Sequence, residues 1–377
     1  MIDRAIHTLI TERMFTGKAI VILGPRQSGK TTLLKRILSE SKCASRFFNC
    51  DELETRKLFS AENIATLQSI IGESKLLLLD EAQKINNAGL TLKLIVDNFP
   101  SIQVIATGSS AFELSDKLNE PLTGRKWEYQ LLPFSFEELA KHNSVLQEIT
   151  KLQNRLLYGS YPEVVNNPGK EPEILSELCS SYLYKDVFAL NDIRKPELVE
   201  KLLTALAMQV SGEVSFNELA QLLNSDPTTI ERYILMLERA FIIFRLSNYS
   251  TNQRNEIKKS RKIYFCDNGI RNALIADFRP IELRDDIGKL WENYVISEFR
   301  KRNSNLKRLC KTHFWRSVSS GEVDYLELQN AQINAYEIKW NLHKKPKTKA
   351  FLRLYPNAAV KIVNPENFFL ELSRDNS

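Results

Sequence analysis

Eight consecutive residues near the start of the chain have the types and spacing of a phosphate-binding loop. They run Gly24-Pro25-Arg26-Gln27-Ser28-Gly29-Lys30-Thr31, fit the pattern G-x-x-x-x-G-K-[ST], and continue into Thr32. In such a loop the backbone N–H groups face a triphosphate, the lysine reaches its β- and γ-phosphates, and the final hydroxyl holds Mg²⁺. An apolar run at residues 19–23 precedes the loop and a helical pattern follows it, as this chemistry requires. We therefore expect residues 24–32 to bind ATP, with Thr31 as a magnesium ligand and Lys30 as a catalytic group.

Two carboxylates follow a second buried-strand pattern. The leucine run at residues 76–79 leads directly into Asp80 and Glu81. A carboxylate at the end of such a strand can help Thr31 to hold Mg²⁺, and the next can orient and deprotonate an attacking water. On its own the pattern could be a core strand that enters an acidic turn. Downstream of the phosphate-binding loop, it predicts hydrolysis of ATP with Asp80 on the metal and Glu81 as the base.

A third apolar run, at residues 102–106, ends in Thr107-Gly108-Ser109-Ser110. We expect this strand to lie between the strand of Asp80 and the strand of the loop. Ser109 or Ser110 could then sense the γ-phosphate. The alternative is that these residues form an ordinary turn at the end of the strand.

One arginine is a candidate for action between subunits. Arg125 lies in a loop at residues 121–125. Such a residue can act as an arginine finger that stabilises charge on the transferred phosphoryl group of a neighbouring subunit, which implies a homo-oligomer. The alternative is a surface arginine with a structural partner.

The C-terminal part carries a second set of residues that could do chemistry. Alternation places Glu337 and Lys339 on one face of a strand, and Asp324 lies on the preceding strand of the same hairpin. Carboxylates can hold Mg²⁺ and a lysine can activate water against a phosphodiester. Glu292, on the helix before, could join Asp324 and Glu337 as a metal ligand. The alternative is a solvated hairpin with charges on its outer face.

The order of the patterns indicates an α/β protein with several domains. Strand and helix patterns alternate at first, which predicts a parallel sheet covered on both faces in residues 1–150. Residues 151–280 read as mostly helical and end in two helices, from residues 218 and 226, and a hairpin, the order of a winged helix-turn-helix. Residues 281–377 read as a helix followed by three strands.

Composition narrows the class of protein and its partners. The chain has 377 residues, of which 43% are hydrophobic and 26% charged, which is typical of a globular protein with more than one domain. Its net charge of +6 comes with basic clusters at residues 254–262, 300–311 and 339–349. These clusters favour nucleic acid as a partner, although each could be a solvated face. The five scattered cysteines form no C-x-x-C pair, and neither a signal peptide nor a membrane span is visible, so we expect a cytoplasmic protein.

Taken together, these motifs resemble those of the AAA+-related prokaryotic ATPases. The resemblance rests on residues 24–31, 76–83, 107–110, 122–125 and 133–138, and the stretch at 158–165 is similar to the glycine-glycine-x-proline stretch of the archaeal-type group. Ser160 stands where that stretch has its second glycine. The C-terminal part resembles the uncharacterised domain that accompanies this ATPase, and its Asp324, Glu337 and Lys339 match the PD-(D/E)XK nuclease pattern. The resemblance implies an AAA+ ATPase domain, a winged helix-turn-helix region and a nuclease-like α/β domain.

Three functions follow as hypotheses. The first is an ATPase that uses ATP and Mg²⁺ and acts on or with DNA. The second is an ATP-dependent switch or chaperone-like module that binds proteins and has an inactive C-terminal domain. The third is a metal-dependent nuclease with a regulatory ATPase.

Overall fold

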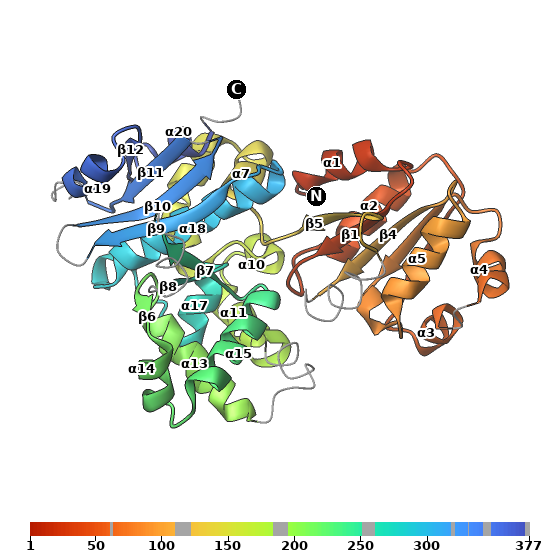
Figure 1. The fold of residues 1–377 in the computed structure, drawn as a ribbon, viewed down its shortest axis with the longest axis horizontal. Helices are drawn as coiled ribbons and strands as arrows, with labels where there is room; N and C mark the ends of the chain where they lie inside the picture. The colour runs from red at the N-terminus through yellow and green to blue at the C-terminus, as the bar shows by residue number, and fades with distance from the viewer. Residues whose placement is uncertain are drawn as a thin grey trace.

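The chain folds into two lobes, which Figure 1 shows side by side. Of the residues that the structure describes, those up to residue 130 form the first lobe and those after it form the second. The computed structural model describes residues 1–60, 63–109, 122–183, 195–250, 261–317, 321–330, 332–341 and 348–373, and gives only the backbone of residues 181–183.

The first lobe is built on a five-stranded sheet in the order β2-β3-β4-β1-β5, in which all neighbours are parallel. Its strands are β1 (Ala19–Leu23), β2 (Ser45–Asn49), β3 (Leu76–Asp80), β4 (Gln103–Gly108) and β5 (Lys126–Gln130). Every residue of β1, β3 and β4 is buried, as expected for central strands that helices cover on both sides. The predicted parallel α/β sheet is confirmed, and β4 lies between β3 and β1.

Successive residues of these strands serve two different cores. On one face, Ile20 and Ile22 pack against α1 and α2; on the other, Val21 and Leu23 pack in a core with α4 and α5. The helices of this lobe are α1 (Ile6–Arg13), α2 (Lys30–Glu40), α3 (Leu53–Phe59), α4 (Ile64–Ile71) and α5 (Ala88–Asn98), with a 3₁₀ turn η1 at Ala82–Lys84. The alternation of apolar side chains therefore holds both helical layers on one sheet.

A seven-stranded mixed sheet forms the centre of the second lobe, in the order β12-β11-β10-β9-β7-β8-β6. Its strands are β6 (Glu213–Val214), β7 (Ile243–Asn248), β8 (Arg261–Phe265), β9 (Lys311–Ser317), β10 (Gly321–Gln329), β11 (Gln332–Ile338) and β12 (Ala359–Val363). The pairing of β7 with β9 is parallel and rests on Ser247 with His313 and Asn248 with Phe314. This pairing makes one sheet out of strands from both sides of residue 280, where the sequence suggested a domain boundary.

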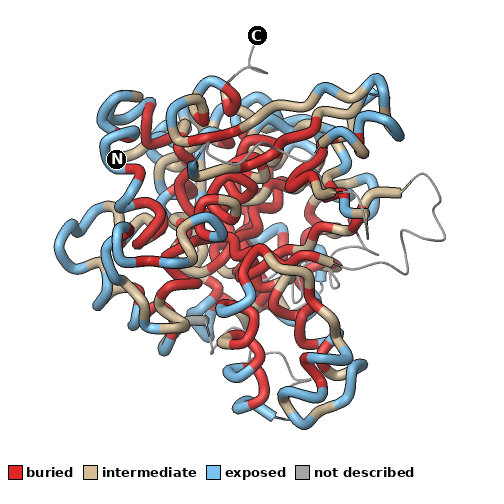
Figure 2. The backbone as a smooth tube through the Cα atoms, turned by 90° about the vertical axis from the view of Figure 1, so that its left-hand side faces the viewer, coloured by how far each residue is buried: buried red, intermediate tan, exposed pale blue. Residues whose placement is uncertain are grey.

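Helices surround this sheet and extend below it in Figure 1. They are α7 (Phe136–His142), α8 (Val145–Thr150), α9 (Leu152–Tyr158), α10 (Pro162–Asn166), α11 (Glu171–Glu177), the π-helical η2 (Leu178–Leu183), α13 (Pro196–Met208), α14 (Phe216–Leu222), α15 (Pro227–Arg239), α17 (Asn268–Leu274), η3 (Ile281–Leu283), α18 (Ile287–Asn305), α19 (Lys349–Leu354) and α20 (Phe368–Ser373). Trp291 and Phe299 of α18 are fully buried in a core with residues of β10 and β11. Figure 2 shows this buried interior running through the sheet and the helices packed on it.

Helix caps fix the start of two predicted helices. Ser135 and Glu138 form a full capping box at α7, since each side chain accepts a hydrogen bond from the other residue's backbone. At α14, Ser215 accepts a hydrogen bond from the Glu218 N–H. In the described part of the chain no helix is long and apolar enough to cross a bilayer, and the cytoplasmic location stays a prediction.

Candidate ATP site

The predicted phosphate-binding loop joins the end of β1 to the start of α2, at the carboxyl edge of the first sheet. Its two glycines are needed for different reasons. Gly29 has a φ of +95°, which a residue with a Cβ rarely adopts. A Cβ on Gly24 would lie 2.1 Å from the Leu131 carbonyl oxygen. The loop therefore has a left-handed turn directly before α2 and lies tightly against the chain that leaves β5.

Two polar side chains of the loop are placed for an anion. The Lys30 ammonium donates hydrogen bonds to the carbonyl oxygens of Gly24 and Pro25, at 2.9 and 2.8 Å. The Ser28 hydroxyl is buried and has no hydrogen-bond partner among the described residues. A buried hydroxyl without a partner is costly, so a phosphate oxygen at this position would be favoured. The backbone N–H groups at the start of α2 lie at the positive end of the helix dipole, which also favours a bound anion.

Asp80 is the centre of a hydrogen-bond network at the end of β3. Its two carboxylate oxygens accept from the hydroxyls of Thr31 and Thr107, both at 2.6 Å. The Thr107 hydroxyl in turn accepts from the Glu81 N–H at 3.0 Å. The structure therefore brings together Thr31, Asp80 and Glu81 as the sequence predicts, and it adds Thr107. Thr107 ends the third apolar run of the sequence, but only the serines that follow it were predicted as site residues.

Glu81 has an unusual backbone and a fixed side chain. Its φ of 53° lies in the left-handed region, which is a costly conformation for a residue with a Cβ. The Gln83 amide donates to the Glu81 carboxylate at 2.5 Å and to the Ser109 hydroxyl at 2.9 Å. Gln83 thus links the predicted base to the predicted sensor. Sequence reasoning gave Gln83 no role, and Ser110 lies outside the described residues.

Some of these residues line a cavity of about 510 Å³ between the two lobes. Lys30, Thr31 and Glu81 line it from the first lobe, and Pro162 and Glu163 at the start of α10 line it from the second. Its full lining is Arg26, Gln27, Gly29, Lys30, Thr31, Thr32, Asp51, Glu81, Lys84, Pro162 and Glu163. A volume of this order suits a nucleotide-sized ligand. Asp51, Lys84, Pro162 and Glu163 were not predicted as site residues.

Residues 158–165 include Pro162 and Glu163, which line this cavity, and the residues before them are bonded within the second lobe. Gly159 has a φ of +69°, and a Cβ there would lie 1.9 Å from a carboxylate oxygen of Asp267. The Ser160 N–H donates to Asp267 at 2.8 Å, and the Ser160 hydroxyl donates to the Phe134 carbonyl at 2.7 Å. The serine that replaces a glycine of the family stretch is therefore accommodated and contributes a hydrogen bond.

Arg125 lies at the amino ends of the strands, on the side of the sheet opposite to the phosphate-binding loop. It directly precedes β5, whose first residue pairs with Ala19 at the start of β1, whereas the phosphate-binding loop follows the end of β1. Its guanidinium forms an ion pair with Asp97 at 2.6 Å, and both side chains are exposed. Arg125 is therefore not part of its own chain's site, and only a contact between subunits could give it the predicted role.

The C-terminal candidates also come together. The Lys339 ammonium lies 3.2 Å from Asp324 and 2.9 Å from Glu337, across the β10–β11 hairpin. Asp324 also accepts a hydrogen bond from the Ile338 N–H at 2.7 Å. Burial raises the pKa of Glu337 to about 7, and the nearby Asp324 charge adds to this rise. One Glu337 oxygen is buried without a hydrogen-bond partner among the described residues.

Glu292 reaches this cluster through a residue that the sequence did not indicate. Lys262 of β8 is buried, and its ammonium lies 3.0 Å from Glu292 and also contacts Glu322. The Tyr264 hydroxyl donates to Glu292 at 2.8 Å. Burial raises the pKa of Glu292 to about 7, although Lys262 opposes the rise. Burial alone would lower the pKa of Lys262, but the carboxylates around it raise it well above its usual value.

The carboxylates of this cluster are thus arranged around ammonium groups. In the described residues no group of three or more His, Cys, Asp or Glu side chains is placed to hold a metal ion. The proposed ligands Glu292, Asp324 and Glu337 are close, but Lys262 supplies a positive charge where a metal would be needed. The geometry supports the grouping of these residues and gives no support to a preformed metal site.

The second helix of the predicted winged helix-turn-helix, α15, has one buried face and one charged face. The face of α15 with Ile230, Tyr233 and Ile234 is buried, as its pattern predicted. Glu231 on the other face pairs with Arg261 at 3.0 Å. Most of the basic cluster at residues 254–262, which favoured nucleic acid as a partner, lies outside the described residues.

Three family models of known protein domains match successive parts of the chain. Residues 16–140 match the family model of an AAA domain. Residues 149–281 and 287–375 match two domains of unknown function, DUF8612 and DUF4143.

Two relatives align with most of the chain, and both are uncharacterized proteins. An uncharacterized protein of Haemophilus influenzae is 27% identical over 351 residues, which cover 86% of this chain and 84% of the relative. An uncharacterized protein of Mycobacterium tuberculosis is 25% identical over 329 residues, which cover 85% of this chain and 70% of the relative.

Among solved structures, a signal transduction ATPase with numerous domains from Pyrococcus horikoshii is 12% identical with a TM-score of 0.30. The match covers 81% of this chain and 48% of that protein, and a score this low does not establish a shared fold. The AAA family model, the parallel sheet and the loop geometry carry the assignment: residues 16–140 form a P-loop ATPase domain of the AAA type.

Proposed function

We propose that the protein binds and hydrolyses ATP at the loop of residues 24–32 and couples hydrolysis to its second lobe. The observation that carries the proposal is the placement of Lys30, Thr31 and Glu81 around one cavity that Pro162 and Glu163 complete. Asp80 lies behind them, hydrogen-bonded to Thr31. Residues from both lobes line the cavity, so a bound nucleotide would contact both. A change in the nucleotide can then alter how the lobes meet.

Magnesium is the metal that this site would take. The Thr31 hydroxyl and Asp80 carboxylate supply the hard oxygen ligands that Mg²⁺ prefers, and they lie 2.6 Å apart. Bound Mg²⁺ would neutralise charge on the β- and γ-phosphates. Lys30 would leave its loop carbonyls for the phosphates, Glu81 would orient and deprotonate the water, and Ser109 would be aligned through Gln83. In an oligomer, Arg125 would complete the site of a neighbour.

Nucleotide binding is tested first with Lys30→Ala. We expect this variant to lose at least about tenfold in ATP affinity, because charge-assisted contacts to the phosphates are lost. Binding of a fluorescent ATP analogue is the measurement, and Lys35→Ala on the exposed side of the same helix is the matched control. Equal affinity in the three proteins would contradict the assignment of the loop.

We further propose that the second lobe acts on or with DNA. The succession α13, β6, α14, α15 and the β7–β8 hairpin supports a winged helix. The succession α18, β9, β10, β11, α19 and β12, with Lys339 close to Asp324 and Glu337, supports a nuclease-like domain that carries Glu292, Asp324, Glu337 and Lys339. ATPase rates with and without DNA at low salt test this part. No DNA binding at low salt would refute it, since phosphate contacts are strongest there.

A second candidate function is favoured by one observation. Lys262 is buried among the carboxylates of the nuclease-like cluster and contacts Glu292 and Glu322. This arrangement supports an ATP-dependent switch that binds protein partners and has an inactive C-terminal domain. Incubation of supercoiled DNA with Mg²⁺ or Mn²⁺ separates the two candidates. Cleavage that Lys339→Ala abolishes would support a nuclease, whereas cleavage unchanged by Lys339→Ala would refute the assigned site.

A further inference from the structure

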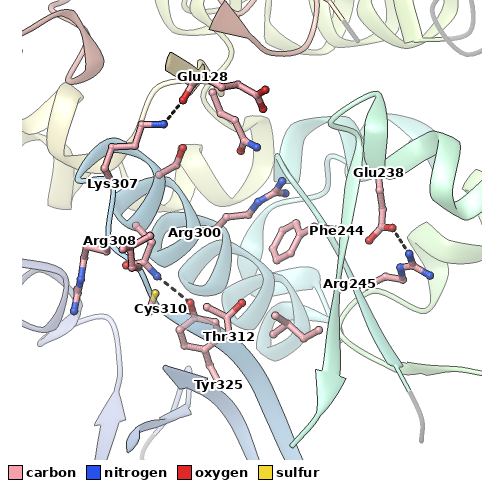
Figure 3. Close-up of a pocket in the computed structure, with 15 residues that line it drawn as sticks. Glu128, Glu238, Phe244, Arg245, Arg300, Lys307, Arg308, Cys310, Thr312 and Tyr325 are labelled. Carbon is pink, nitrogen blue, oxygen red and sulfur yellow. Dashed lines mark hydrogen bonds and ion pairs between the residues drawn. The ribbon is translucent and has the colours of Figure 1, made fainter. Parts of the chain in front are cut away.

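A second large cavity lies away from the ATP site, where the first lobe meets the end of α18. It has a volume of about 540 Å³ and is lined from β5, α15, β7, α18, β9, β10 and the loop after α18. Figure 3 shows Arg300 in the middle of its lining, with Lys307 and Glu128 on one side and the Glu238–Arg245 pair on the other. No residue of the ATP site or of the carboxylate cluster lines it.

The charged side chains of this cavity are not balanced. Four cationic and two anionic side chains line it, an excess of two positive charges: Arg245, Arg300, Lys307 and Arg308 against Glu128 and Glu238. Arg245 is neutralised by Glu238 at 2.5 Å. Arg308 donates to the Gln329 side chain at 3.1 Å and lies 4.0 Å from the Glu327 carboxylate, and Glu128 is paired with Lys126 at 2.7 Å. The unbalanced charge therefore falls on Arg300 and Lys307.

Neither of these two residues forms an ion pair with a carboxylate of the described chain. The Arg300 guanidinium donates to the Cys266 sulfur at 3.0 Å and lies 4.5 Å from the centre of the Phe244 ring. Burial raises the pKa of the Cys266 thiol, so this partner is neutral. Lys307 donates to the backbone carbonyl of Glu128 and lies over the Tyr129 ring at 4.3 Å. Arg300 is half-buried, and a half-buried cation without a counter-charge is unfavourable, so a bound anion would offset that cost.

We infer that this cavity binds a phosphate-bearing ligand, with Arg300 and Lys307 as the residues that contact the phosphate. A phosphate group carries up to two negative charges, which match the excess of the lining, and guanidinium groups bind phosphate oxygens with paired hydrogen bonds. The volume exceeds the space that a single phosphate needs, so the ligand carries further atoms beside the aromatic ring of Phe244. Two sources share this chemistry: a phosphorylated small molecule and the backbone of a nucleic acid.

The position of the cavity connects it with the ATPase domain. The Lys307 ammonium donates to the backbone carbonyl of Glu128 in the edge strand β5. Glu128 pairs with Val21 of β1, and β1 leads into the phosphate-binding loop. The inference does not rest on the proposed ATPase, because Arg300 and Lys307 lie outside the ATP site; both belong to the basic cluster at residues 300–311, so nucleic acid as the source would deepen the proposed DNA function.

The test uses the full chain with Lys30→Ala, so that the ATP site does not capture the probes. Pyrophosphate binding is measured by calorimetry, and binding of a labelled single-stranded oligonucleotide by fluorescence anisotropy. We expect at least one probe to bind, and Arg300→Gln to weaken that binding about tenfold or more, as loss of a charge-assisted hydrogen bond predicts. Arg279→Gln is the matched control, because this exposed arginine lies outside the cavity and pairs with Asp277.

Lys307→Gln is the second variant, and its exposed position makes it safe for folding even if Arg300→Gln fails to fold. Binding of pyrophosphate but not of the oligonucleotide identifies a small molecule as the source, and the reverse identifies nucleic acid. Absence of binding for both probes would overturn the inference. Equal affinity in the parent, the Lys307→Gln protein and the Arg279→Gln protein would overturn it as well.

Discussion

Replacement of Lys262 by methionine tests the charge arrangement in the second lobe most sharply. The change keeps the length of the side chain and removes the ammonium that contacts Glu292 and Glu322. Lys262 is only 3% exposed, so water cannot replace it without rearrangement. The variant therefore leaves buried carboxylates without their counter-charge.

The expected loss in the free energy of unfolding follows from the burial of Lys262. Removal of one partner of a buried ion pair costs about 3–5 kcal/mol, because the remaining charge is no longer compensated. The loss depends on pH, since the pKa of Glu292 is about 7 in the folded protein. At pH 8 Glu292 is ionised and needs Lys262; at pH 5.5 it is mostly protonated and needs it less. The loss in unfolding free energy should therefore be larger at pH 8 than at pH 5.5.

The assay is urea denaturation of the wild type and the variant at both pH values. Arg261→Met is the matched control: Arg261 is the neighbouring residue on β8, and its pair with Glu231 is largely exposed. We expect the control to cost no more than about 1 kcal/mol at either pH. A Lys262→Met loss as small as that of the control, or one that grows as the pH falls, would refute the reasoning.

The remaining predictions concern pH, the turn beside the ATP site and Arg125. Because the folded pKa values of Glu292 and Glu337 are raised from 4.5 to about 7, their contribution to stability is present below pH 4.5 and is lost as the pH rises through 7. The wild-type urea midpoint should thus be higher at pH 5.5 than at pH 8, and an increase with pH would contradict this. Gly159→Ala should cost more than about 3 kcal/mol, because its Cβ would overlap Asp267 at a backbone conformation that only glycine adopts readily. Gly169→Ala, at a φ of +90° in open space, should cost only about 1–2 kcal/mol, and similar losses in thermal unfolding of the two would contradict the overlap. Arg125→Ala should leave ATP affinity unchanged and lower the hydrolysis rate only under conditions where subunits associate; a hydrolysis rate that stays equal to the wild type at high protein concentration would rule out the finger.

The ATP site could be predicted from the sequence because its signals are local. Gly24, Gly29 and Lys30 lie within one loop, and the buried run before Asp80 identifies a strand by itself. Thr107 and Gln83 could not be assigned in the same way. Their roles depend on side-chain hydrogen bonds to Asp80, Glu81 and Ser109 that are set only when β3 and β4 pair.

The second lobe shows a long-range pairing that sequence patterns do not encode. The single seven-stranded sheet depends on a parallel pairing of β7 with β9 that joins residues more than sixty positions apart through two residue pairs, Ser247 with His313 and Asn248 with Phe314. No local pattern encodes such a pairing. The same pairing brings Lys262 of β8 to Glu292 and Glu322, so the cluster acquired a lysine that its motif does not contain.

The central claim is ATP hydrolysis with Glu81 as the base, and the most direct measurement compares the wild type with Glu81→Gln. The amide keeps the size and the hydrogen bond toward Gln83 but cannot accept the proton of the attacking water. We predict that Glu81→Gln binds ATP as tightly as the wild type and hydrolyses it at least about a hundredfold more slowly, the usual contribution of a general base. Hydrolysis by Glu81→Gln at the wild-type rate would contradict the account.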